Sequence, residues 1–149
     1  MKKILKLTVF TVVLLMLAGG LTTCKSNEKP LKLTCLEDTE WKLTAFVDTQ
    51  TGTLTEPEPK SCNECYTLKF ETNTLCGVTS SNRFCGDYKI DYEVHSIRIS
   101  NIAGDEKGEQ GYGSQYYRDL LAVQSFSYNK NELKLFYNDK KNYLLFKSN

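Results

Sequence analysis

The chain has 149 residues, of which 40% are hydrophobic, and its 19 basic and 18 acidic side chains nearly cancel. Such a length allows one domain with a substantial core, and it is too short for two once a targeting segment is set aside. A nearly neutral chain without a clustered basic face is not expected to bind nucleic acid.

The first residues predict export and lipid attachment. Three lysines precede the short apolar run Leu7–Leu17, which is the layout of a bacterial secretory signal and too short for a membrane-spanning helix. The sequence Leu21-Thr22-Thr23-Cys24 resembles a lipobox, where signal peptidase II cuts before an acylated cysteine. Residues 1–23 are therefore predicted to be a signal peptide, and acyl chains on Cys24 are predicted to make the membrane a partner of the protein.

The residues after this cysteine indicate the destination. Lys25 stands where enteric lipoproteins that stay at the inner membrane have an aspartate, so by this resemblance we expect an outer-membrane lipoprotein. The periplasmic face is favoured because Lys25–Lys29 lacks a clear acidic export run, and surface exposure stays open. We expect residues 24–34 to be the lipidated cysteine and a flexible tether, and residues 35–149 to be the domain. Loss of the signal leaves 16 basic against 18 acidic residues, a formal charge of −2.

Short runs of alternating apolar and polar residues predict a mostly β domain. Nine tyrosines and seven phenylalanines agree with this. Between these runs, Asp48–Glu64 is predicted to be a long loop, and the Gly-rich stretch Ala103–Gly113 is predicted to be a linker because it holds no phosphate-binding motif. The expected strands are Glu40–Val47, Tyr66–Phe70, Leu75–Val78, Gly86–Glu93, His95–Ile102, Ser125–Tyr128, Glu132–Tyr137 and Asn142–Lys147.

One helix is predicted, over Ser114–Gln124. Ser114 is suited to cap its first turn. A stripe at helical spacing is expected to pack on the sheet rather than to hold a cofactor. The stripe consists of Tyr117, Leu120, Leu121 and Gln124. The three strands that follow are then expected to form a C-terminal meander.

The stretch Gly77–Tyr88 is predicted to be a β-hairpin corner. Ser80, Ser81 and Asn82 lie between two strand-like runs, and their short polar side chains favour a turn because they bond to nearby backbone groups. Gly86 follows, where the missing side chain allows a close approach of another backbone.

The corner and the first strand resemble the META domain, the HslJ-like family. Its early Trp-Lys-Leu is matched by Trp41-Lys42-Leu43, and its corner Gly-Cys-Asn-Arg-Phe-x-Gly-x-Tyr by Ser80–Tyr88. The resemblance implies an α+β, mostly β antiparallel domain, a cracked barrel or curved sheet with one helix packed on it, and no defined activity. It also implies structural roles for Asn82, Arg83, Phe84, Gly86 and Tyr88. Ser81 replaces a cysteine of the family, as in versions typical of Bacteroides-type lipoproteins, so the crosslink made by that cysteine is not expected.

Five cysteines follow the lipidated one, namely Cys35, Cys62, Cys65, Cys76 and Cys85. Disulfides are the default in an exported protein, and five thiols allow two bridges and one free cysteine. We expect Cys76 to pair with Cys85 across the corner, and the second bridge to join two of the other three. A four-thiolate zinc site of Cys62, Cys65, Cys76 and Cys85 is the alternative. A redox role for Cys62 and Cys65 is less favoured because a Pro-rich loop precedes them and a strand follows.

The sequence predicts no enzyme and no cofactor. The single histidine, His95, has no nucleophile motif around it. The acidic residues Asp105, Glu106 and Glu109 lack calcium-loop spacing, and Arg83 is expected to pair with a carboxylate such as Asp87 rather than to bind an anion.

Three functional hypotheses remain. The first is a monomeric, lipid-anchored, non-catalytic envelope protein with an accessory or stress-related binding role, whose partner is an envelope protein or a lipid. The second is a pilotin-like adaptor with an acyl or peptide crevice beside the helix. The third is a small protease inhibitor that presents residues 48–64 as a stiff loop.

Overall fold

The structure is a computed structural model that describes residues 35–149. The predictions for the signal peptide, Cys24 and the tether lie outside these residues. The elements are β1 (Thr39–Asp48), β2 (Leu54–Thr55), β3 (Thr67–Phe70), β4 (Thr74–Val78), β5 (Arg83–Asp91), β6 (Ser96–Gly104), α2 (Gly113–Leu121), β7 (Ser125–Tyr128), β8 (Glu132–Tyr137) and β9 (Asn142–Ser148).

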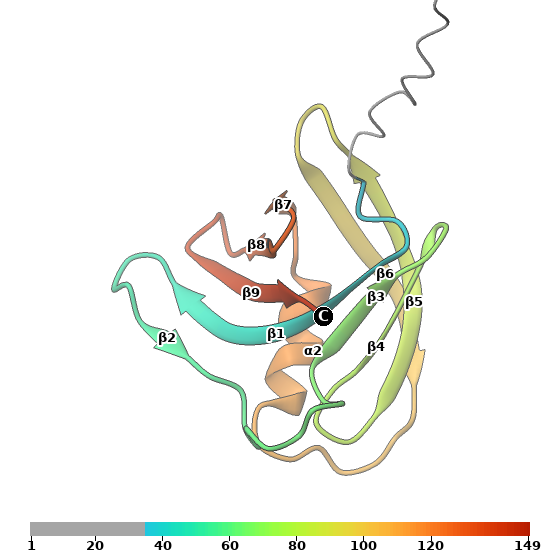
Figure 1. Ribbon diagram of the computed structural model, residues 1–149, viewed down its shortest axis with the longest axis vertical. Coiled ribbons are helices and arrows are strands. Elements are labelled where there is room, and N and C mark those ends of the chain that lie inside the picture. The colour runs from blue at the N-terminus through green and yellow to red at the C-terminus, as the bar shows by residue number, and fades with distance from the viewer. Residues whose placement is uncertain (1–34) are drawn as a thin grey trace, which may run out of the picture. The chain divides into compact units, whose positions relative to one another are not determined.

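The strands form one antiparallel sheet that closes on itself (Figure 1). Its order is β2-β1-β3-β4-β5-β6-β7-β8-β9, and β1 also pairs with β9 along most of its length. The ring is not a regular barrel, because β6 and β7 share only the residue pair Ser96 and Ser125. The predicted mostly β antiparallel fold is therefore confirmed, with the closure supplied by β1.

Strand β1 pairs with both β3 and β9, and a bulge in its backbone accompanies this double pairing. The alternation buries Trp41, Leu43 and Ala45, as predicted, but Phe46 and Val47 are buried as well. The register with β9 shifts between Leu43 and Ala45, and such a bulge bends a strand and changes the faces on which the following side chains lie. The bent strand can then pair with β3 through its first half and with β9 along its length.

Helix α2 fills the interior of the ring. Tyr116 and Leu120 are fully buried, and the Tyr116 ring lies 5.8 Å from Tyr66, 6.2 Å from Phe84 and 6.2 Å from Phe146, measured between centroids. Such tilted and edge-on arrangements are favourable between aromatic rings. The helix thus joins β3, β5 and β9 in one core.

The predicted orientation of this helix is wrong by about one residue. Leu121 is 45% exposed, and the helix ends before Gln124. The buried stripe has the i, i+3, i+4 spacing of Tyr116, Asp119 and Leu120 instead. A sequence with Tyr-Tyr followed by Leu-Leu offers two equivalent stripes, so periodicity could not choose between them.

Two further predictions are corrected at the ends of elements. Ser114 does not cap α2, because the N-cap position is Tyr112 and no side chain caps the helix. The 48–64 segment is not wholly a loop, because Leu54 and Thr55 pair with Val47 and Phe46 of β1. No helix among residues 35–149 is both long enough and apolar enough to cross a bilayer.

Candidate functional site

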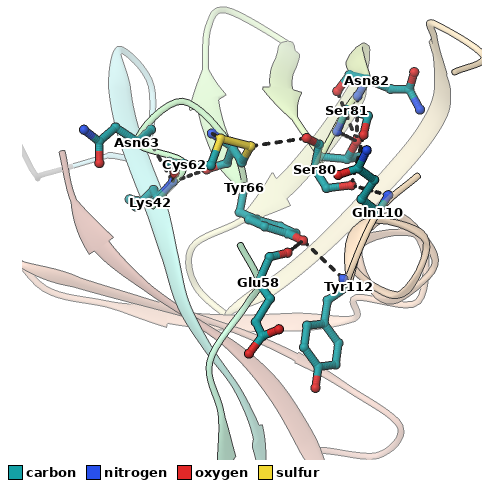
Figure 2. Close-up of a disulfide and its surroundings, with 12 residues drawn as sticks. Lys42, Glu58, Cys62, Asn63, Tyr66, Ser80, Ser81, Asn82, Gln110 and Tyr112 are labelled. Carbon is teal, nitrogen blue, oxygen red and sulfur yellow. Dashed lines mark hydrogen bonds between the residues drawn. A yellow bond between two sulfur atoms is a disulfide. The ribbon is translucent and has the colours of Figure 1, made fainter. Parts of the chain in front are cut away.

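Three segments meet at one end of the ring, the lower end in Figure 1. They are residues 56–66 before β3, the tip 79–82 between β4 and β5, and residues 105–112 before α2. Tyr66 joins all three: its amide donates to the Thr79 carbonyl at 3.0 Å, and its hydroxyl donates to the Glu58 carbonyl and accepts from the Tyr112 amide at 3.2 Å (Figure 2). We call these segments together the three-loop surface.

Glu109 binds the tip with both carboxylate oxygens. Its Oε1 accepts hydrogen bonds from Thr79 Oγ1 at 2.5 Å and from Asn82 Nδ2 at 2.6 Å, and its Oε2 accepts from Ser80 Oγ at 2.6 Å. Burial acts to raise the Glu109 pKa, but the hydrogen bonds from Ser80, Thr79 and Asn82 outweigh it, so the net pKa lies below its ordinary value. Glu109 is therefore held as a carboxylate.

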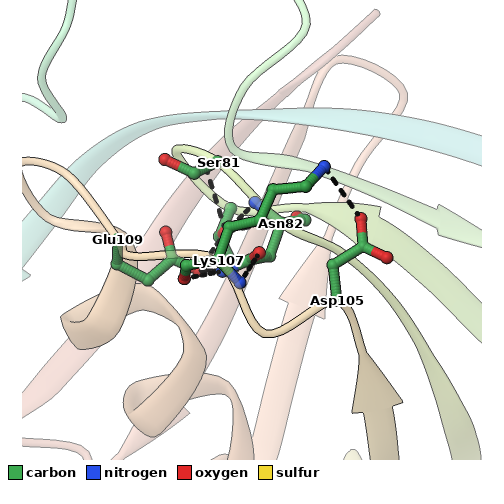
Figure 3. A network of polar contacts seen from close by, with 6 residues as sticks. Ser81, Asn82, Asp105, Lys107 and Glu109 are labelled. Atoms are coloured by element: carbon green, nitrogen blue, oxygen red, sulfur yellow. Dashed lines mark hydrogen bonds and ion pairs between the residues drawn. The ribbon is translucent and has the colours of Figure 1, made fainter.

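The Asn82 side chain binds the backbone of the connector, residues 105–112, that carries Glu109. Its side-chain oxygen accepts from the Lys107 amide at 2.7 Å, while its Nδ2 donates to the Lys107 carbonyl at 2.8 Å (Figure 3). The side chain is only 7% exposed. The stretch predicted to be a plain linker is thus bound to the tip by side chains from both segments. Sequence reasoning missed this role of Glu109. The available signal was the tip itself, because the hydroxyl groups of Thr79 and Ser80 and the amide of Asn82 are hydrogen-bond donors that need an acceptor.

A groove of about 470 Å³ lies between the tip, the end of β6 and the start of α2. Its apolar lining comes from Phe84, Ile102 and Tyr117, and its charged lining from three carboxylates and Arg83. The carboxylates belong to Asp105, Glu106 and Glu109. Such a mixture of apolar and acidic side chains suits a basic, partly apolar segment of another protein.

The remaining corner residues lie in the core of the hairpin. Phe84 is 3% exposed and Tyr88 is 7% exposed, and the Tyr88 hydroxyl donates to the Glu71 carbonyl at 2.9 Å. Burial raises the pKa of Tyr88 to about 12. Gly86 lies opposite Leu75 in the β4–β5 ladder. Arg83 is exposed at the start of β5.

The expected pairing of Arg83 with Asp87 is not what the structure has. The carboxylate of Asp87 accepts a hydrogen bond from Asn101 Nδ2 at 2.7 Å instead. Strand geometry explains this, because residues four positions apart on a strand are far apart, whereas Asn101 lies on the neighbouring strand β6 beside Asp87.

The structure has two disulfides. Cys76 and Cys85, directly opposite in the β4–β5 ladder, form one. Cys62 and Cys65 form the other, and Cys35 is half-buried and free. The four sulfurs of the alternative zinc site are thus engaged with one another in pairs, and no group of three histidine, cysteine or acidic side chains among residues 35–149 is placed to hold a metal ion.

Lys42 holds the Cys62–Cys65 loop through its backbone carbonyl groups. Its ammonium donates to the carbonyl of Cys62 at 2.8 Å, to that of Asn63 at 3.1 Å, and to that of Cys65 (Figure 2). Burial lowers the pKa of Lys42. A second groove, of about 310 Å³, is lined by Lys42, Tyr66, Cys62 and the two prolines of residues 56–66.

His95 lies away from both grooves. It follows the far end of β5 from the tip, in the turn before β6, and its ring lies 5.8 Å from that of Phe126. The backbone there has φ +55°, a left-handed conformation that turn histidines adopt more readily than most residues. A turn position with an aromatic neighbour accounts for this histidine.

Comparison with known proteins places the chain among lipoproteins. No family model matches the sequence. A protein of Tannerella forsythia that carries a provisional lipoprotein name is 35% identical over 148 residues, which cover 95% of each chain.

Two solved structures share the fold. One is the NMR structure of a protein from Burkholderia xenovorans, with 19% identity, a TM-score of 0.62, and coverage of 76% of this chain and 83% of that one. The other is a DUF4847 family protein from Bacteroides vulgatus, with 16% identity, a TM-score of 0.61, and coverage of 76% and 94%. At these identities only the fold is shared, whereas the similarity to the Tannerella protein covers 95% of the sequence. The chain therefore belongs to the same family as this Tannerella forsythia lipoprotein.

Proposed function

We propose that the protein is a lipid-anchored, non-catalytic envelope protein that binds a partner protein through its three-loop surface. The observation that carries this proposal is the Glu109 network, which fixes the tip and the connector beside a groove of about 470 Å³. Loops that are held in place before binding lose less entropy on binding. The acidic and apolar lining favours a basic, partly apolar segment of an envelope protein.

The proposed anchor is a diacylglyceryl thioether on Cys24. Family membership with a lipoprotein and the lipobox-like sequence before this cysteine support it. Lys25 supports the outer membrane as the destination, by resemblance to enteric sorting. The META-like corner supports kinship with the HslJ-like family and with accessory or stress-related roles.

The anchor is tested by growing cells with an alkyne fatty acid and separating the two membranes on a density gradient. We expect the label on the native chain, the chain in the outer-membrane fraction, and loss of both in Cys24→Ser. A labelled C24S chain, or a native chain in the inner membrane, would contradict this assignment.

The binding surface is tested by photo-crosslinking in living cells. A photoreactive amino acid at Ser81, in the tip, should yield a discrete crosslinked protein, and Glu109→Gln should weaken that crosslink by loosening the surface. The matched control is Lys130, an exposed residue in the β7–β8 turn. Equal crosslinking from both positions, or none from Ser81, would argue against the three-loop surface.

An acyl-binding crevice and an inhibitory loop fit the structure less well. The acyl form of the pilotin-like hypothesis needs apolar space beside α2, but Tyr116 and Leu120 fill the interior, and three carboxylates line the groove next to the helix, where an acyl chain would desolvate them at a cost. The peptide form of that hypothesis coincides with the binding proposed above. An inhibitory loop in residues 48–64 would need to stand free, but β2 pairs with β1 and the Glu58 carbonyl is bound by Tyr66.

A further inference from the structure

The Cys62–Cys65 disulfide joins residues only three positions apart. A bridge over so short a loop removes little freedom from the unfolded chain, so it adds less to stability than a bridge over a longer loop. The turn that leads into this loop is held by a backbone bond, since the Cys62 amide donates to the Pro59 carbonyl at 3.2 Å. Within the loop, Lys42 binds the carbonyls of Cys62, Asn63 and Cys65, so contacts other than the bridge also hold its shape.

The two sulfurs differ in access. Cys62 is half-buried and lines the groove of about 310 Å³, whereas Cys65 is 5% exposed and does not line it. An attacking thiolate that entered this groove would therefore reach the sulfur of Cys62. The sulfur of Cys65 would be the leaving group.

The surroundings of the bridge provide the partners that a reduced pair would need. The Cys65 amide donates to Cys62 Sγ at 3.1 Å, a bond that would strengthen to a Cys62 thiolate. Cys65 Sγ lies 3.2 Å from the Ser80 carbonyl oxygen (Figure 2). A disulfide sulfur has no hydrogen to offer that oxygen, whereas a Cys65 thiol would donate to it.

Lys42 keeps the two sulfurs together in either state. Its ammonium binds the carbonyls of Cys62, Asn63 and Cys65, so the turn keeps its shape when the sulfur–sulfur bond is broken. The pair could then close again without a search for the partner sulfur.

We propose that Cys62–Cys65 is a thiol–disulfide exchange site that is served by a dithiol protein. The partner's thiolate attacks Cys62 Sγ, a mixed disulfide forms, and the Cys65 thiolate leaves and takes up a proton. The partner's second thiolate then attacks its own sulfur in the mixed disulfide and releases the Cys62 thiolate. The partner is oxidised to a disulfide by two electrons, and the Cys62–Cys65 pair is reduced by two. The protein is a substrate in this exchange, which agrees with a non-catalytic role and does not depend on the proposed binding function.

The test uses a thioredoxin whose resolving cysteine is replaced by serine, so that the mixed disulfide persists. Cys35 is first blocked with iodoacetamide, the oxidised protein is mixed with the thioredoxin, and newly freed thiols are capped with N-ethylmaleimide. Fragmentation of the tryptic peptide 61–69 should show thioredoxin on Cys62 and N-ethylmaleimide on Cys65. Attachment at Cys65 or at the Cys76–Cys85 pair, or no mixed disulfide, would overturn the proposal.

A second measurement tests the role of Lys42. Lys42→Met should let the bridge be reduced at a dithiothreitol concentration on the order of tenfold lower, because the open dithiol closes less readily. The control Lys130→Met changes an exposed lysine in the β7–β8 turn, outside this groove, and should behave like the native protein. Equal midpoints for K42M and K130M would show that Lys42 does not hold the pair.

Discussion

At the scale of single residues, Glu109 shows how one carboxylate can organise a loop surface. It comes from a connector with little apolar content and cannot be positioned by hydrophobic burial. Hydrogen bonds from three side chains of the tip position it instead. Because these bonds require the ionised form, the surface should depend on pH.

Glu109→Gln should lower the free energy of unfolding by about 1 kcal/mol at pH 7, because Ser80 Oγ loses its charged acceptor. The folded-state pKa of Glu109 lies below its ordinary value of 4.5, so its contribution is complete above that pH and disappears as the pH falls through the folded-state pKa. Urea unfolding between pH 3 and pH 7 should therefore show a shallower acid decline for E109Q. The control is Glu106→Gln, which changes an exposed neighbour. An equal loss of unfolding free energy in E106Q would refute the special role of Glu109.

For Tyr88 we expect the free energy of unfolding to depend on pH in the opposite sense, with a loss at alkaline pH. Burial raises its pKa from 10.0 to about 12, so the stability linked to it is complete below pH 10 and is lost as the pH rises toward 12. Tyr88→Phe should lose about 1 kcal/mol at pH 7 with the bond to the Glu71 carbonyl, and it should fall less steeply above pH 10. Parallel curves for the two proteins in urea unfolding would contradict the assignment.

At the scale of elements, α2 buries one of two adjacent leucines and exposes the other, and the sequence pattern cannot distinguish them. Leu120 is fully buried, and Leu121 is 45% exposed. Leu120→Ala should lower the free energy of unfolding by about 3 kcal/mol, since it opens a cavity inside the ring. Leu121→Ala should change it by less than about 0.5 kcal/mol. Similar losses for both in chemical denaturation would mean that the helix is rotated from its described position.

Gly77 in β4 and Gly108 in the connector before α2 form a second matched pair. A Cβ at Gly77 would lie 2.3 Å from the Thr67 carbonyl oxygen and 2.6 Å from Phe84 Cζ, whereas a Cβ at Gly108 would meet nothing within 4 Å. Gly77→Ala should therefore cost about 3 kcal/mol by overpacking, and Gly108→Ala should leave the thermal unfolding midpoint nearly unchanged. A stable G77A variant would show that β3 and β5 do not approach β4 this closely.

Much of this architecture could be predicted from the sequence. The strands around Trp41, Leu68 and Ile97 alternate clearly, and turn residues separate them from their neighbours, so local patterns were sufficient there. The direct pairing of Cys76 with Cys85 also followed from the short hairpin between them. What local patterns could not give is long-range: the closure of β1 on β9, the short strand β2, and the bond from Glu109 to a tip some 30 residues away.

At the scale of the whole molecule, the ring separates the start of the described domain from the three-loop surface. The described chain begins at Cys35, next to the segment that carries the predicted anchor, and Leu36 is tied to the Tyr92 hydroxyl at 2.9 Å. Tyr92 follows the end of β5 opposite the tip. The point where the described chain enters the domain and the three-loop surface thus lie at opposite ends of β5.

Native mass spectrometry of the protein, extracted gently from its own envelope with Cys24 intact, tests the central claim most directly. We expect the acylated chain together with a population of larger mass that carries a bound protein. We expect Glu109→Gln to reduce that population, and we expect Glu93→Gln, at an exposed position in the turn between β5 and β6, to leave it unchanged. An acylated chain with no added mass in any variant, or the same added mass in all three, would contradict binding through the three-loop surface.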